Sequence, residues 1–347
     1  MTSALGAPVE VVNAGVSGYG PDQIEARLEI ELPGLKPDLV IVFIYAGNDF
    51  GDLMRDKMFK LDDMGNLQSV PFVLDGSLIA QFEKARRGLV LLKIVDYLKL
   101  RLNEHFTPQA DIERWLRTAS EEYEDYVVRG DNTVRDLLAD HPDVDVSTDP
   151  ESPAARYKVR LMEQVLLRIQ AICERASAPL LFVFIPSPID VCDGCDVQHV
   201  DRMRFPHYRR SNNTDILQRI AVDHAAQFIN LFSRFRDAGA ERLYFHRDDH
   251  WNDDGQALAA QEVQDYIVRH KLLQERLEAP PSLQAKTAGE IRPTVFANLR
   301  RRKLEGIFVR SPKQQFGGHH DVPRQLVPPP ASVAPEEGQQ PGAVERR

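Results

Sequence analysis

Three short motifs in this sequence carry residue types that can act on a carbonyl group. NAGVSGYG covers residues 13–20, YAGNDF covers 45–50 and YFHRDDHWNDDG covers 244–255. Together they offer backbone N–H groups, an asparagine amide and an Asp/His pair. An imidazole that titrates near neutral pH can move a proton, and uncharged donors can stabilise a developing negative oxygen. The motifs therefore predict a site for acyl chemistry if the fold brings them together.

Each motif also has a purely structural interpretation. The glycine-rich turn fits a backbone that needs positive φ, and GND after an apolar run fits a turn in which Asn48 caps a helix. DDHWNDDG fits an acidic loop that caps a helix through Asn252 or Asp253, or a cation loop. Calcium is disfavoured, because a loop with Gly255 at the sixth place has Gln261, not glutamate, at the twelfth. The occurrence of all three motifs in this order favours a functional site.

Four apolar, β-branched runs are predicted to be the strands that position these motifs. Three of them, over 9–13, 38–46 and 179–185, are almost continuously apolar, and a weaker one covers 227–232. Strands of this kind are buried on both faces, as in parallel sheets. Ligands gather outside the carboxyl ends of such strands, which is where the first two motifs lie.

Helices are predicted between and after these strands, over 21–32, 152–176 and roughly 254–273. The first begins at Pro21, which suits a first helical turn, and the second has Ser152 as its N-cap. Their buried faces are predicted to hold Ile24, Leu28 and Leu32; Val159, Met162, Leu166 and Ile169; and Leu258, Val263 and Ile267. The alternation of strands and helices predicts an α/β fold with a doubly wound, mostly parallel sheet.

The chain is predicted to have three parts. Residues 1–50 and 153–275 form the α/β domain, and 51–152 form a mainly helical insertion rich in acidic residues. A helix near 89–102 is predicted to pack on the protein, with a position on a membrane surface as the less favoured alternative. Proline, glutamine, glutamate and glycine without periodicity predict a largely disordered tail over 276–347.

The composition excludes some partners. A formal net charge of −9 leaves no positive surplus for nucleic acid. The longest apolar stretch, 88–102, is interrupted by charged residues, so no stable membrane insertion is expected. The opening MTSALGAPVE lacks the pattern of a secretory leader. As written the chain is predicted to be cytoplasmic, whereas an export signal upstream would make it periplasmic or secreted. The oligomeric state cannot be read from these residues.

The CDGC motif has several interpretations, of which redox catalysis is the least favoured. Cys192 and Cys195, with His199, give three metal ligands, which is short of a closed zinc site unless His207 or Asp193 joins them. A local disulfide fits an exported protein, and two free thiols in a loop fit a cytosolic one. No metal and no cofactor are expected.

The order of the three motifs resembles the SGNH (GDSL-type) hydrolase superfamily. The resemblance covers roughly residues 8–50 and 178–272 and rests on a glycine turn, G-N-D, and D-x-H-x-N before a last helix. In that family a serine in an early G-D-S motif attacks an ester carbonyl. The backbone N–H of that serine, a glycine N–H and an asparagine side chain form the oxyanion hole.

The resemblance gives roles to four residues. Gly18 would supply the glycine N–H and Asn48 the amide donor. His250 would be the general base that takes the proton of the serine, and Asp248 would orient its imidazole. The resemblance also implies the fold, a flavodoxin-like SGNH sheet, and no metal.

The spacing of the acid and the base departs from the commonest family pattern. D-x-x-H would require an aspartate at position 247, where Arg247 stands. The pair Asp248-x-His250, followed by Trp251, is similar to the branch that includes alginate O-acetyltransferase-like proteins. Asp249 is the weaker candidate, because adjacent side chains in extended backbone point to opposite sides.

A second departure concerns the nucleophile. No G-D-S motif occurs in the sequence, and Ser17 in GVSGYG does not fit G-x-S-x-G. In the family the missing motif follows a strand between the first two strands predicted here. Without that strand, buried backbone groups would be left unpaired at a cost of about 1–3 kcal/mol each. The sequence is therefore expected to be an N-terminally truncated form that is inactive as given.

These features predict a serine esterase or O-acyltransferase that works through an acyl-enzyme. Its substrate would be a small-molecule or glycan ester, including an acetylated carbohydrate. The alternative is a catalytically dead module of the same fold that binds carbohydrate or lipid. A flavodoxin-like nucleotide binder is disfavoured, because no G-x-G-x-x-G motif appears.

Overall fold

The computed structural model describes residues 8–16, 18–76, 108–136, 141–193, 200–245 and 250–273. Contacts divide the chain into two units, 1–290 and 291–347, and every described residue belongs to the first. The described part is a mixed α/β structure around a small parallel sheet.

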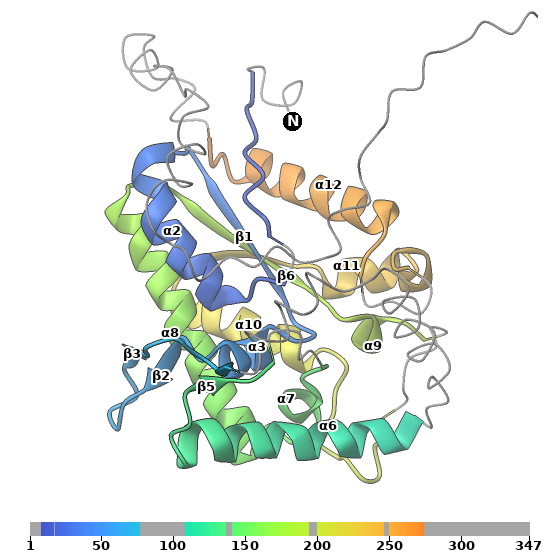
Figure 1. Ribbon diagram of the computed structural model, residues 1–347. Helices are drawn as coiled ribbons and strands as arrows, with labels where there is room; N and C mark the ends of the chain where they lie inside the picture. The colour runs from blue at the N-terminus through green and yellow to red at the C-terminus, as the bar shows by residue number, and fades with distance from the viewer. Residues whose placement is uncertain are drawn as a thin grey trace, which may run out of the picture. The chain divides into compact units, whose positions relative to one another are not determined.

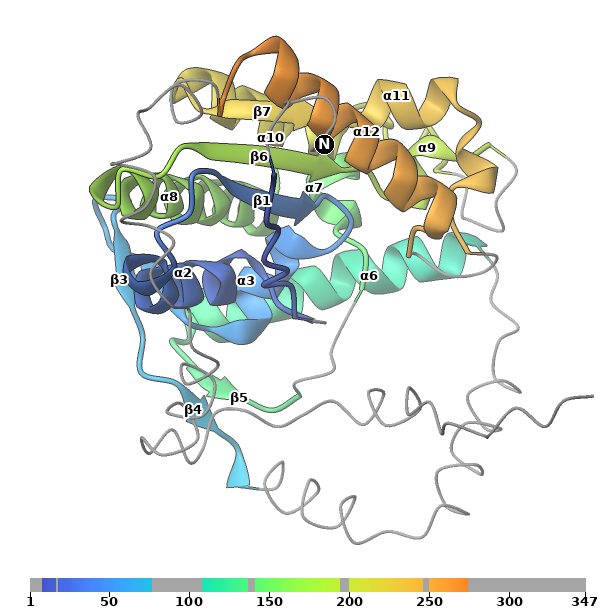
Figure 2. The same ribbon diagram turned by 90° about the horizontal axis from the view of Figure 1, so that it is seen from above.

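The sheet has three parallel strands in the order β1-β6-β7. These are β1 (Val40–Tyr45), β6 (Leu180–Ile185) and β7 (Gln227–Asn230), and Figure 2 shows them side by side. β1 pairs along its whole length with β6, from Val40 opposite Leu180 to the last residues of both strands. Three of the four predicted strands are thus confirmed, including the weaker one that became β7.

The strand predicted over 9–13 is wrong. Residues 8–16 belong to no sheet, and Val11 and Val12 have 78% and 56% of their surface exposed. β1 is an edge strand, and within the described residues nothing pairs with its outer edge. A β-branched run becomes a strand only where a neighbouring edge accepts its hydrogen bonds. Residues 8–16 do not pair with β1 or with any other described strand, so they form no strand.

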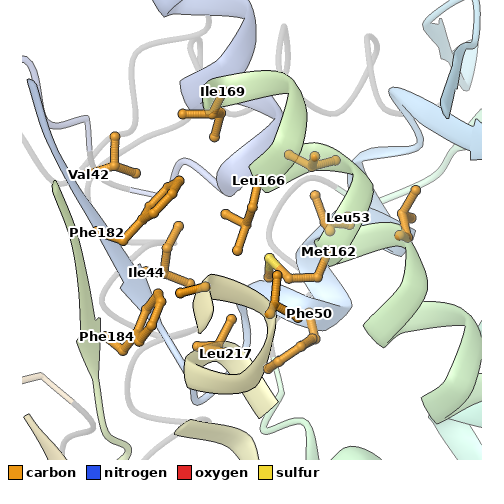
Figure 3. Packing of buried hydrophobic residues seen from close by; sticks show 14 of the residues in the cluster. Val42, Ile44, Phe50, Leu53, Met162, Leu166, Ile169, Phe182, Phe184 and Leu217 are labelled. Carbon is orange, nitrogen blue, oxygen red and sulfur yellow. The ribbon is translucent and has the colours of Figure 1, made fainter. Parts of the chain in front are cut away.

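Three helices cover one face of the sheet: α2 (Pro21–Leu35), α8 (Pro153–Arg175) and α10 (Asn212–Asp223). Their apolar faces and one face of β1 and β6 form the larger core cluster (Figure 3). Its labelled members are Val42, Ile44, Phe50, Leu53, Met162, Leu166, Ile169, Phe182, Phe184 and Leu217. The predicted start of α2 at Pro21 is confirmed. So is the Ser152 cap of α8, whose side chain accepts a hydrogen bond from the backbone N–H of Ala155.

The opposite face is covered by shorter elements and by the last described helix. α9 (Pro188–Val191) follows β6, α11 (Phe232–Asp237) follows β7, and α12 (Asp253–Arg269) returns across the sheet (Figure 1). A second cluster lies beneath them and includes Leu181, Val183, Phe235, Val263 and Ile267. Each face of the sheet therefore packs against helices, as the near-continuous apolar strands predicted.

The described part of the predicted insertion contains short strands as well as helices. The helices are α3 (Asp49–Asp56), α6 (Pro108–Tyr123), a π-helical turn over Glu124–Val128 and α7 (Val144–Thr148). The strands are β2 (Phe59–Leu61) with β3 (Leu67–Ser69), antiparallel, and β4 (Val73–Leu74) with β5 (Thr133–Val134), parallel. The helix predicted near 89–102 and the tail predicted over 276–347 lie outside the described residues.

None of the helices in the described ranges has the length and apolar character needed to cross a bilayer.

Candidate functional site

The topology brings the three sequence motifs to one edge of the sheet, the edge at which its parallel strands end. The strands are parallel, so the loops after β1, β6 and β7 leave the sheet at the same side. Only four residues separate the end of α2 from the start of β1, so α2 begins near the opposite end of that strand. α12 begins on this side as well (Figure 2). Gly18, Asn48 and His250 therefore lie on loops of the same edge, and their convergence on one pocket stays a prediction.

The first motif forms a turn that presents the backbone of Gly18. The N–H of Tyr19 donates to the carbonyl of Val16 at 3.2 Å, and Gly18 has a φ of 79°. The structural interpretation of this glycine, a backbone with positive φ, is thus confirmed. Gly18 is exposed, and within the described residues no group accepts a hydrogen bond from its N–H. That N–H is available to a ligand.

Gly20 has a different role from Gly18. Its φ of −83° is accessible to any residue, but a Cβ here would lie 3.0 Å from the Cβ of Asp52. The missing side chain lets the start of α2 pack directly against α3. The two glycines therefore set the shape of the turn and its distance from the second motif.

The second motif holds Asn48 at the start of α3 through its backbone. Its carbonyl accepts hydrogen bonds from the N–H groups of Gly51 and Asp52, both at 2.9 Å, and from Nη2 of Arg55 at 3.1 Å. The side chain of Asn48 makes no capping hydrogen bond. Asn48 is thus the N-cap residue of α3, as the structural interpretation predicted, but it caps the helix without a side-chain hydrogen bond, and its side chain is half-buried.

A buried carboxylate from the insertion fixes the loop that carries Asn48. Asp143 accepts a hydrogen bond from the N–H of Gly51 at 2.8 Å, and its own N–H donates to the carbonyl of Gly47 at 2.7 Å. Inside the loop, the N–H of Tyr45 donates to Oδ2 of Asp49 at 2.7 Å. Burial raises the pKa of Asp49 well above its usual range, and the neighbouring Asp52 charge adds to this.

Lys158 of α8 compensates the charge of Asp143. Its Nζ lies 2.9 Å from Oδ1 of Asp143 and 3.0 Å from Oδ1 of Asp145, and all three side chains are buried. Burial by itself lowers the pKa of Lys158, but the two carboxylates outweigh it and raise that pKa above its ordinary value. Nδ2 of Asn213 donates to the carbonyl of Ala46 at 2.9 Å, which ties α10 to the same loop.

This network was missed in the sequence, although a signal for it exists. Lys158 lies three residues after the buried Ala155 and four before the buried Met162, on the apolar stripe of α8. A lysine at that spacing must bury its charge, which requires carboxylates nearby.

The third motif is attached to β1 through Trp251. The rings of Trp251 and Phe43 meet edge to face, with centroids 6.2 Å apart, and Trp251 also stacks on Phe235. Tyr244 and Trp251 form an isolated β-bridge, and the carbonyl of His250 accepts a hydrogen bond from the N–H of Phe245 at 3.0 Å. His250 is exposed at this anchored turn. Asp248 lies outside the described residues.

The residues after His250 are structural. Oδ1 of Asn252 accepts hydrogen bonds from the N–H groups of Asp254 and Gly255 at 3.0 and 3.2 Å, and Nδ2 donates to the carbonyl of Arg242 at 2.8 Å. The prediction that Asn252 caps the last helix is confirmed. A Cβ on Gly255 would lie 2.5 Å from the carbonyl oxygen of Leu243, so only glycine fits there.

A group of buried carboxyls lies where α2 meets α3. Asp22 is completely buried, and burial together with the Asp56 charge raises its pKa well above its usual range. Burial and the charge of Asp52 raise the pKa of Asp56 to about 7. The side chains of Asp22 and Asp56 interact, and an Oδ2 atom of each is buried without a hydrogen-bond partner in the described part of the chain. Two carboxyls that are buried side by side are stabilised when one of them keeps its proton.

Two cysteines in the described ranges bear on the predicted metal and thiol chemistry. No group of three or more His, Cys, Asp or Glu side chains there is arranged to hold a metal ion. Cys192 is disulfide-bonded, so the interpretations of Cys192 as a free thiol or a metal ligand are wrong. Cys195 and His199 lie outside the described residues, and the buried Cys173 is free.

No family model matches this chain, and no curated protein and no solved structure matches it either. The site is therefore interpreted from its own geometry.

We expect Lys158→Met to lower the free energy of unfolding by about 3–5 kcal/mol, because it removes the cation paired with the buried Asp143 and Asp145 and leaves only Arg55 to offset the charge of Asp143. The matched control is Arg160→Met on the same helix, whose pair with Glu163 is half-exposed. That change should cost less than about 1 kcal/mol. Urea unfolding measures both. Equal losses in the two variants would contradict a structural role for the buried charges.

The proton retained on Asp56 predicts that the free energy of unfolding decreases as the pH rises. Asp56 has a pKa of about 7 in the folded state and an ordinary aspartate pKa of 3.8 in the unfolded chain, so only the folded state keeps the proton between these pH values. The contribution is therefore fully present below pH 4 and is lost as the pH rises to about 7, by at most about 1.4 kcal/mol per pH unit.

Asp56→Asn removes this titration, so the decline between pH 4 and pH 7 should become shallower than in the wild type. Asp237→Asn, at an exposed position at the end of α11, should leave the decline unchanged. Urea unfolding at several pH values separates the two variants. If the free energy of unfolding of Asp56→Asn declined with pH as steeply as that of the wild type, Asp56 would not keep its proton in the folded state.

Proposed function

We propose that this edge of the sheet carries the base and the oxyanion donors of an ester-cleaving site of the SGNH type. The observation that carries the proposal is the common placement of the three motifs on loops of one edge, with the third motif anchored to β1 by the contact of Trp251 with Phe43. The exposed N–H of Gly18, which no described group accepts, supports its role as a donor. A doubly wound SGNH sheet is part of the same proposal.

The proposed reaction has two stages, acylation of a serine and deacylation. A serine Oγ attacks the ester carbonyl while His250 takes its proton, and Asp248 holds the imidazole in the correct tautomer. The N–H of Gly18 and the amide of Asn48 donate to the oxyanion, and one such donor is worth roughly 10²–10³ in rate. The intermediate collapses to an acyl-enzyme, and His250 protonates the leaving alkoxide. Water or a sugar hydroxyl then takes the acyl group by the reverse steps.

The serine of this proposal is not among the 347 residues, which contain no G-D-S motif. It would follow an additional strand between residues 8–16 and β1. The unpaired outer edge of β1 and the exposed, unpaired segment 8–16 support this position. Phe43, on β1, is 40% exposed. Without the serine, catalysis would fall by about 10⁶, so the chain as given would be inactive.

A binding module is the second candidate. The absence of a G-D-S motif favours it, because oxyanion donors without a nucleophile can still hold the carbonyl of an acylated carbohydrate or lipid. The two candidates differ in covalent chemistry, which is directly measurable.

The test uses the protein translated from the gene together with the codons that precede Met1. If these encode a G-D-S block, a fluorophosphonate should label the extended protein and p-nitrophenyl acetate should be hydrolysed. His250→Ala should lower kcat/KM by about 10³ or more, and Asn48→Ala by roughly 10²–10³. His270→Ala, at the exposed end of α12, is the matched control and should leave kcat/KM unchanged.

An in-frame stop codon before Met1, without G-D-S codons, would end the enzyme hypothesis. A folded, extended protein that neither labels nor hydrolyses the ester would favour the binding module instead.

A further inference from the structure

An arginine-lined pocket of about 370 Å³ lies between the segment before α10 and the helix α11. Four guanidinium groups face it, with one carboxylate and the ring of a buried tyrosine. These residues are Arg202, Arg209, Arg210, Arg236, Asp193 and Tyr208. The chain as a whole is acidic, with a formal net charge of −9, so this local excess of positive charge stands out. Four cations around one hollow repel one another unless an anion is present.

Two of these arginines are held in place by the same carboxylate. Arg210 pairs with Asp193 and donates to the carbonyl of Cys192 at 3.2 Å. Arg236 lies 3.5 Å from the other oxygen of Asp193 and also reaches the carbonyl of Val191. Asp193 is thus shared by two guanidinium groups, and the buried Asp190 also interacts with Arg210.

The other two arginines pair with no carboxylate of the described residues. The side chains of Arg202 and Arg209 are exposed, and neither makes a hydrogen bond or an ion pair within the described residues. The start of α10, a helix of 12 residues, adds the partial positive charge of its N-terminus next to Ser211. The pocket therefore combines two fixed guanidiniums, two that can close over a ligand, and a helix end of the same sign.

We propose that this pocket binds a small molecule through an oxyanion, either a carboxylate or a phosphate group. The planar guanidinium presents paired N–H donors that match two oxygens of such a group. Arg210 and Arg236 would form the floor of the site, and Arg202 and Arg209 would close over the anion. Tyr208 and Phe232 supply apolar surface for the body of the ligand.

The pocket is distinct from the ester chemistry proposed above. Its walls come from α11, which follows β7, and from the residues around α9, which follows β6. It therefore lies at the same sheet edge as Asn48 and His250, but it uses none of the proposed catalytic groups. Binding of an anion here does not depend on a nucleophilic serine.

The experiment is calorimetric titration of the full chain with glucose 6-phosphate, glucuronate and glucose at constant ionic strength. At least one of the two anions should bind, and neutral glucose should not. The tighter of the two anions identifies phosphate or carboxylate as the preferred group. Binding should weaken as NaCl is added, because the contacts are between charges. No binding of either anion above that of glucose would overturn the proposal.

Two variants with the same charge change provide the control. Arg209→Gln removes a guanidinium from the pocket and should weaken anion binding by roughly 10-fold. Arg219→Gln removes an exposed arginine of α10 that does not line the pocket, and should leave binding unchanged. Both side chains are exposed, so neither change should alter the melting temperature without ligand. Equal weakening by the two variants would show that the anion senses only net charge and would also overturn the proposal.

Discussion

The buried ion cluster around Asp143 is the interaction on which the candidate site depends. Its carboxylate contacts Lys158 of α8 and the N–H of Gly51, and its N–H holds the carbonyl of Gly47. Removing charges from water is costly, so such a cluster persists only when nearly every oxygen and proton has a partner. Here those partners are backbone groups on both sides of Asn48. The same bonds that satisfy the buried charges thus determine where the amide of Asn48 sits.

The two functional proposals draw on different parts of the same sheet edge. The ester site would use loops before α2 and after β1, which are held by buried polar groups. The anion pocket uses side chains around α9, α10 and α11, which are partly exposed and mutually repulsive. The first would need a nucleophile, whereas the second would bind an anion with the arginines already present. A ligand that is both an ester and an anion would fit an edge with these two properties.

The sequence predicted the parts of this structure that follow from local periodicity. The strands β1, β6 and β7 and the starts of α2, α8 and α12 have signals within a few residues. The segment 9–13 has the same strand signal but fails, because pairing depends on a neighbour that no local pattern reveals.

Contacts between distant residues were also beyond local patterns. The arginines of the pocket are spread over residues 202–236 and form no motif, and the sequence indicated only that Lys158 needs carboxylates nearby, not which ones.

Within the described residues, the unpaired side of β1 has one more consequence. Its alternate N–H and C=O groups can pair with an extended segment of another chain, including β1 of a second molecule.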